Sequence, residues 1–339
     1  MRRVEAATQR RKPTKQRKAK RGPSEAKKEE WKNRSRDLFD ALVQGVNDTD
    51  LDTWKSMLVR QTDFIEYSFL NTCLIVAHWE ELKRSGVVDG DITVVAPRTR
   101  WAKRNRTIRD EMRRNGLPIF VPMLKRIKAE TDDEDETERR VRFFRIRWVY
   151  DVTQTEGEGT WERQHPRHVG GDSGIAVEYA ERLIAYLRDR KGITVEVRPL
   201  ALTDPVDMAV QGFWSPDRRL IVVGTRTREG VALDEPMRLR ILLHEAAHAL
   251  LGHTAQTTLP AKGLQEVEAE SSAYVVGSAI GLEAGDYSFG YVKGWLQTLP
   301  EDKRGRELLD TGGKVARVAR ELLVSGLNAY ADSEAEDGE

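Results

Sequence analysis

The sequence has a single cysteine and no long hydrophobic run. Cys73 is the only cysteine among 339 residues, which excludes an internal disulfide and suggests a reducing compartment. No apolar stretch approaches the roughly 20 residues that span a bilayer, and the basic N-terminus has no apolar segment typical of a signal peptide. We therefore expect a cytoplasmic protein with no membrane partner.

Net charge is also nearly absent, because 56 Lys and Arg residues are matched by 55 Asp and Glu residues. The total excludes no class of partner, but the basic residues are unevenly distributed. Residues 1–21 hold ten Lys or Arg and a single acid, Glu5, with almost nothing apolar to form a core. This pattern predicts a disordered basic arm over residues 1–29, either a solubilising tail or an arm that contacts nucleic acid.

The hydrophobic pattern divides the chain into two folded regions, as its length suggests. Residues 30–155 form one domain and residues 175–300 the other, with a linker without hydrophobic period at 156–174 and a C-terminal helix and acidic tail at 301–339. The expected elements are helices at 31–46, 54–59, 64–82, 177–187, 235–251 and 263–280 and strands at 92–96, 120–127, 141–150, 194–197, 209–214 and 220–223. The sequence therefore predicts a two-domain α+β protein.

The most informative segment is Leu243–Leu251, which contains the motif HEAAH. On a helix, His244 and His248 lie on one face, so both imidazoles can reach a single tetrahedral ion. Glu245 is placed to take a proton from water activated by that ion. The alternative is a core helix with two hydrogen-bonded histidines.

A zinc site of this kind needs a third protein ligand. His253 is displaced by one residue from the longer HExxHxxGxxH pattern and would point away from His244. Glu266 and Glu270 share one face of the next helix, so either could be the ligand, with the other supporting an imidazole. A solvated acidic face is the simpler alternative. A His-His-Glu site would hold Zn²⁺ and hydrolyse amide bonds, making the C-terminal domain a minimal metallopeptidase of helices packed on a small sheet.

The segments 266–276 and 286–295, with the motifs EVEAESSAYVV and DYSFGYVKGW, resemble the C-terminal half of ArdC-type antirestriction proteins of plasmids, phages and other mobile elements. That half is a minimal metallopeptidase akin to the ImmA/IrrE and SprT-like domains. The resemblance implies that Glu266, the first Glu of an E-x-x-A segment, is the third metal ligand.

The N-terminal half resembles the same family through three further segments: YSFLNTCLI at 67–75, WAKRNRTI at 101–108 with Asn105 where Gly is usual, and VYDVTQTE at 149–156. The resemblance thus covers roughly residues 36–300 and implies an N-terminal domain that binds single-stranded DNA. Residues 98–114 are strongly basic and include Trp101, which suits contact with phosphates and bases. The DNA-binding candidates are Tyr67, Ser68, Asn71, Trp101, Arg104 and Arg106; from the residues alone, Trp101 would be a core residue.

Three functions remain open at this point. The first is an antirestriction-type protein that binds single-stranded DNA and carries a zinc-dependent peptidase site with an unknown protein or peptide substrate. The second is a DNA-binding protein whose metal is structural or inactive. The third is a regulatory peptidase that cleaves a repressor or another DNA-bound protein.

Overall fold

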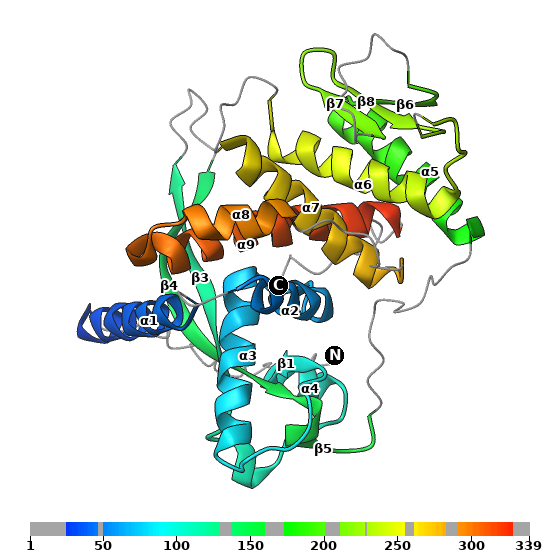
Figure 1. The fold of residues 1–339 in the computed structure, drawn as a ribbon. Helices are drawn as coiled ribbons and strands as arrows, with labels where there is room; N and C mark the ends of the chain where they lie inside the picture. Colours follow the sequence, from blue (N-terminus) through cyan, green and yellow to red (C-terminus); the bar gives the residue numbers. More distant parts are fainter. Residues whose placement is uncertain are drawn as a thin grey trace, which may run out of the picture.

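The fold mixes helices with three small sheets (Figure 1). The computed structural model describes residues 25–46, 50–128, 137–159, 173–200, 211–227, 229–254, 261–282 and 290–327. Most of the predicted basic arm and linker, and nearly all of the acidic tail, lie outside these residues. Within them, no helix is long and apolar enough to cross a membrane.

The N-terminal half combines helices with a long hairpin. Its helices are α1 (Glu25–Val46), α2 (Leu51–Asp63), α3 (Phe69–Arg84) and the short α4 (Arg98–Lys103). Strands β3 (Leu117–Lys128) and β4 (Thr137–Asp151) form an antiparallel hairpin, and β1 (Val95–Pro97) pairs with the end of β4. A second sheet pairs β2 (Thr107–Ile108) with β5 (Thr155–Glu156); single 3₁₀ turns occur at Asp110–Met112 and Val152–Gln154.

The C-terminal half places helices against a three-stranded sheet of order β6-β8-β7. Strand β8 (Leu220–Gly224) pairs in parallel with β6 (Thr194–Arg198) and antiparallel with β7 (Gly212–Ser215), as the predicted hairpin requires. The helices are α5 (Ser173–Lys191), α6 (Glu235–Leu251), α7 (Ala261–Ala279), α8 (Gly290–Thr298) and α9 (Glu301–Gly326).

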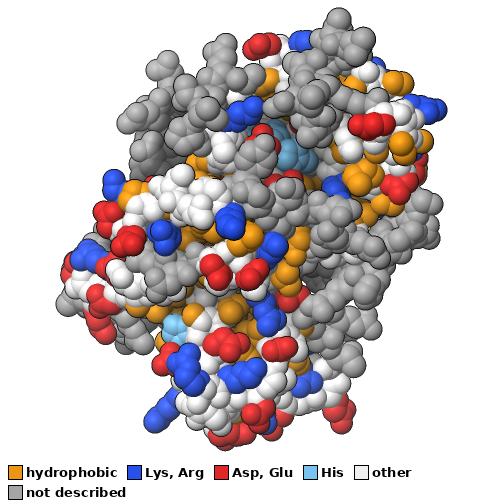
Figure 2. Space-filling view, viewed as in Figure 1, with side chains coloured by type: hydrophobic (Ala, Val, Ile, Leu, Met, Phe, Trp, Pro, Cys, Tyr) orange, Lys and Arg blue, Asp and Glu red, His pale blue; other side chains and the backbone are white. Residues whose placement is uncertain are grey.

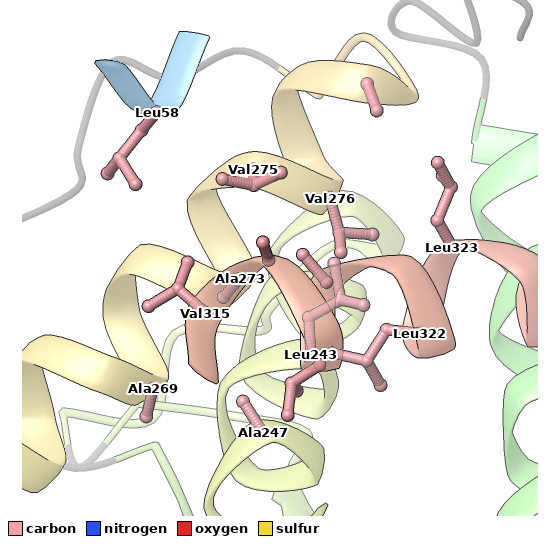
Figure 3. Packing of buried hydrophobic residues seen from close by; sticks show 14 of the residues in the cluster. Leu58, Leu243, Ala247, Ala269, Ala273, Val275, Val276, Val315, Leu322 and Leu323 are labelled. Atoms are coloured by element: carbon pink, nitrogen blue, oxygen red, sulfur yellow. The ribbon is translucent and has the colours of Figure 1, made fainter. Parts of the chain in front are cut away.

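The largest hydrophobic core is built around α6, α7 and α9 (Figure 3). Small side chains on facing turns, such as Ala247, Ala269 and Ala273, let α6 and α7 approach closely, while Val315 and Leu322 of α9 fill the space beside them. The same core includes Leu58 of α2, so its side chains come from both sides of the predicted linker. Division into two domains therefore remains a prediction, and α9 is an integral part of the core.

Candidate metal centre

Helix α6 carries the HEAAH motif and has well-defined ends. The side chain of Asp234 accepts a hydrogen bond from the backbone N–H of Met237, and Pro236 stands in the first turn. Gly252 ends the helix in the left-handed conformation with φ 73°, which a residue without Cβ adopts at little cost. These signals set where α6 begins and ends. His244 and His248, four residues apart, lie on the face of this helix that packs against α7.

Three side chains converge on one point between α6 and α7. The Nε2 atoms of His244 and His248 lie 3.0 Å apart. Oε2 of Glu266 lies 3.4 Å from Nε2 of His244 and 3.5 Å from Nε2 of His248. Each residue thus offers one ligand atom to a common centre, and these atoms all lie within 4.8 Å of one another.

These separations fit a tetrahedral divalent ion. Zinc bonds of about 2.0–2.1 Å with tetrahedral angles place two ligand atoms roughly 3.3 Å apart, close to the observed values. Three protein ligands leave one position for water or substrate, the arrangement of catalytic zinc sites. The site is also accessible to solvent, since the side chains of His244 and Glu266 are each 23% exposed. Figure 2 shows histidine at the surface in the upper part of the view, with acidic side chains beside it.

Glu245 lies next to the three ligands but is oriented toward strand β7. Its residue is buried, and the backbone of Trp214 provides a hydrogen bond to its carboxylate. Gly212 of β7 lies so close that a Cβ there would approach Cγ of Glu245 to 3.4 Å. Burial raises the pKa of Glu245 to about 7, partly offset by the charge of His244. A carboxyl that titrates near neutrality can both accept and return a proton.

The ligands themselves form a strongly coupled group. Burial alone would lower the pKa of His244, but hydrogen bonds with Glu266 and Glu270 raise it to about 10. Burial lowers the pKa of His248 to about 4. Burial would raise the pKa of Glu266, but its close contacts with the two imidazoles hold that pKa well below its usual range. Without an ion, His244 is therefore protonated on both ring nitrogens, with Nδ1 facing Glu270 and Nε2 facing Glu266.

Glu270 supports His244 from the side away from the centre. Its Oε2 lies 3.1 Å from Nδ1 of His244. A carboxylate only accepts, so Nδ1 carries a hydrogen directed at Glu270, and once an ion replaces the hydrogen on Nε2, that nitrogen would present a lone pair to the ion. Of the two acids that the residues alone left open, Glu266 has the ligand geometry and Glu270 the supporting geometry.

The DNA-binding candidates of the N-terminal half are occupied within the fold. The indole of Trp101 is fully buried and donates to the carbonyl of Tyr150 over 2.9 Å. Because a base cannot stack on a ring without an open face, Trp101 packs the core instead. The amide of Asn71 bonds both backbone groups of Phe120, at 3.0 and 2.8 Å.

The remaining candidates also have structural roles. Tyr67 donates its hydroxyl to the carbonyl of Val95 over 3.1 Å, and Ser68 caps α3. The guanidinium of Arg106 is held by Thr155 and by the carbonyls of Gly157 and Gly159. Arg104 is partly buried at the end of α4, followed by Asn105. Asn105 has φ 55°, a conformation that favours Gly or Asn and explains why both residue types suit this position.

Two groups of residues were not predicted as functional. Buried Glu268 and His253 meet beside His248. Phe144 and Trp148 are exposed on β4 by 49% and 42%. In the sequence, Phe144 and Trp148 could have been found from their alternation with the arginines of this strand. No local pattern links Glu268 to His253, because they lie 15 residues apart.

No family model and no curated protein matches the chain, but solved structures do. The fold is similar to the antirestriction protein ArdC from the R388 plasmid in its metal-free structure, at 15% identity and a TM-score of 0.44, over 83% of this chain and 99% of that one. The Mn(II)-bound structure of ArdC gives 14% identity and a TM-score of 0.43. Both structures are of ArdC, an antirestriction protein of the kind that the sequence motifs resemble.

Proposed function

We propose that this protein is a metal-dependent hydrolase that cleaves amide bonds in a protein or peptide. One observation carries the proposal, namely the convergence of His244, His248 and Glu266 on one point with Glu245 beside them. Two imidazoles and a carboxylate suit Zn²⁺, the proposed ion, and also several other divalent ions. Core histidines without a metal would need no third acid and no open position.

The residues divide the chemistry among them. When bound, a divalent ion acidifies water and polarises a carbonyl oxygen. The carboxylate of Glu245 accepts the proton that water loses and returns it to the nitrogen of the leaving amine. The backbone of Trp214 orients Glu245, and Glu270 orients His244.

Metal content and peptidase activity test this proposal together. The purified protein should contain one ion per chain, and His244→Ala should lose it. Glu245→Gln should retain the ion and lose about 10²–10⁴-fold in cleavage of a protein substrate such as casein, because only the general base is removed. Glu181→Gln, an exposed acid on α5, is the matched control. Full cleavage by Glu245→Gln, or a metal-free wild type, would contradict the proposal.

A second activity, binding of single-stranded DNA, is favoured by the exposed aromatics of β4. Phe144 and Trp148 are four residues apart on one strand and so point to the same side of the hairpin. Arg145 and Arg147 occupy the alternate positions and so point to the other side of the strand; burial together with the charge of Arg147 lowers the pKa of Arg145. Strand β1 pairs only with residues 149–151 of β4. Exposed rings on one side of this stretch of strand and arginines on its other side suit a single nucleic-acid strand that follows its edge.

Fluorescence anisotropy with a labelled single-stranded oligonucleotide tests this surface. Trp148→Ala and Phe144→Ala should each weaken binding by about 5–150-fold, the value of one base stacked on one ring. Arg147→Ala should reduce the salt dependence of binding by about one counterion. Val197→Ala and Arg190→Ala are matched controls, since Val197 is 46% exposed on β6 and Arg190 is exposed on α5. Unchanged binding in both aromatic variants would exclude this surface.

The biological role proposed from the sequence resemblance is protection or processing of incoming mobile DNA. A restriction assay in cells that express wild type or Glu245→Gln separates the open alternatives. Loss of protection in the variant would assign the role to the peptidase, and equal protection would assign it to DNA binding with a dispensable metal site. Cleavage of protein only when single-stranded DNA is added would favour a regulatory peptidase.

A further inference from the structure

His253 is buried beside the metal centre but directs neither ring nitrogen at it. The residue follows Gly252 at the end of α6, and its backbone N–H donates to the carbonyl of His248 over 3.0 Å. Nδ1 of His253 lies 2.8 Å from Nδ1 of His248, and Nε2 of His253 lies 2.9 Å from Oε2 of Glu268. Both nitrogens are therefore engaged, and His253 has none left to offer to an ion.

The chain of contacts continues to the surface. Oε1 of Glu268 accepts a hydrogen bond from Nζ of Lys314 on α9 over 2.6 Å. The side chain of Glu268 is 4% exposed whereas that of Lys314 is 51% exposed. A buried carboxylate needs such partners to remain charged. Four residues from α6, the turn after it, α7 and α9 thus form one connected line that ends at the metal ligand His248.

With His253 neutral, the chemistry of these groups permits one arrangement of hydrogens. The carboxylate of Glu268 accepts only, so Nε2 of His253 carries the hydrogen between them. In a neutral His253 the other nitrogen, Nδ1, is then an acceptor. The facing Nδ1 of His248 must therefore be the donor, which leaves Nε2 of His248 with a lone pair directed at the metal centre.

We propose that Glu268, held by Lys314, sets the tautomers of His253 and His248, and that His253 is a positioning residue for the metal ligand His248. This inference rests on the proposed metal site. It gives the two ligands different supports: His244 contacts a carboxylate directly through Glu270, whereas His248 contacts one through the intervening ring of His253. The second support extends from α6 across α7 to α9, so the orientation of His248 depends on the packing of three helices.

Metal affinity tests the positioning role. In the full chain, competition with a chelating dye for Zn²⁺ should show about 10–100-fold weaker binding in His253→Ala and Glu268→Gln, the usual cost of losing a residue that supports a ligand. Glu268→Gln preserves volume and serves if His253→Ala does not fold. Lys314→Met should have a smaller effect in wild type and none in Glu268→Gln, because it acts only through that carboxylate. Arg317→Met, exposed on the same helix, is the control.

Nitrogen NMR of the metal-free protein tests the tautomers independently of metal. The chain has six histidines, so ¹⁵N-labelled rings can be assigned by single substitutions. We expect His253 to be protonated at Nε2 alone and His248 at Nδ1, and Glu268→Gln to mix the tautomers of His253. If wild type bound no ion, the proposed function would fail while these spectra still decided the tautomers. The inference is overturned if Glu268→Gln leaves either the spectra or the affinity unchanged.

Discussion

At the scale of single residues, the candidate site holds a proton where an ion would bind. The hydrogen bonds of Glu266 and Glu270 keep the pKa of His244 at about 10, so His244 is charged at neutral pH in the metal-free protein, whereas His248, with a pKa of about 4, is neutral. Glu266 is already ionised because its pKa is depressed. Binding of a divalent ion at Nε2 must therefore displace a proton of His244.

We accordingly predict release of about one proton per ion near pH 7.5. Affinity should rise by about tenfold per pH unit from pH 7 toward pH 9, because the site is mostly protonated below the pKa of His244, and should level off above it. Calorimetric titration in two buffers with different ionisation enthalpies measures the release directly. A value of zero would show that His244 is neutral before the ion binds.

Cys73 provides a second prediction at this scale. The thiol is buried in α3, and burial raises its pKa to about 12. Since the thiolate is the reactive form, and its fraction falls about tenfold per unit of pKa, Cys73 should react with Ellman's reagent at pH 8 at least about 100-fold more slowly than in urea. Cys73→Ser should abolish the slow reaction. Rapid labelling of the native protein would mean that this helix opens readily.

Residue-scale prediction from sequence succeeded where spacing alone decides the geometry. The i, i+4 histidines were placed correctly because a helix fixes their separation, and the ligand role of Glu266 remains a prediction that the geometry supports. Trp101 is different, because an indole among arginines has the same local sequence whether it stacks on a base or fills a core. Only the contact with Tyr150, 49 residues away, separates the two.

At the scale of elements, the close contact between α9 and α3 depends on one glycine. A Cβ at Gly312 would lie 2.2 Å from the ring of Phe69, which is itself buried. Gly312→Ala should therefore destabilise the protein by about 1–3 kcal/mol despite the better helix propensity of alanine, because the ring has little room to move. Chemical denaturation followed by circular dichroism measures this change.

The adjacent Gly313 is a matched control. It is exposed in the same helix, and a Cβ there would meet nothing within 4 Å. Gly313→Ala should stabilise the protein by about 0.5–1 kcal/mol through helix propensity alone. Equal effects of the two substitutions, in either direction, would show that α9 does not pack on Phe69.

Element positions were predicted better than element partners. Apolar periodicity located the major helices, and two apolar runs separated by turn residues located the β7–β8 hairpin. Both patterns are local in the sequence. The short α4 was missed, as six residues that include three basic side chains show no apolar period. Helix α9 was expected but set apart from the core, because nothing in its own sequence indicates that Gly312 meets Phe69 and Gly326 meets Tyr179.

At the scale of the whole molecule, the two halves share polar and aromatic contacts as well as a hydrophobic core. The indole of Trp54 in α2 donates to Oγ of Ser271 in α7 over 3.2 Å and packs edge-on against Trp295 at 5.9 Å. Oγ1 of Thr62 donates to the carbonyl of Val275 over 3.3 Å. A C-terminal half separated from α2 would expose the apolar surface beside α7 that these residues cover.

A protease site inserted within residues 160–172 tests this arrangement. After cleavage the two halves should remain associated and co-elute in size-exclusion chromatography, because the shared core is apolar and separation would expose it to water. They should separate in urea, which provides the control for complete cleavage. Independent elution at micromolar concentration would mean that the predicted domains fold separately. Co-elution would instead make the proposed DNA binding by the hairpin and the proposed metal binding by α6 and α7 properties of one folding unit.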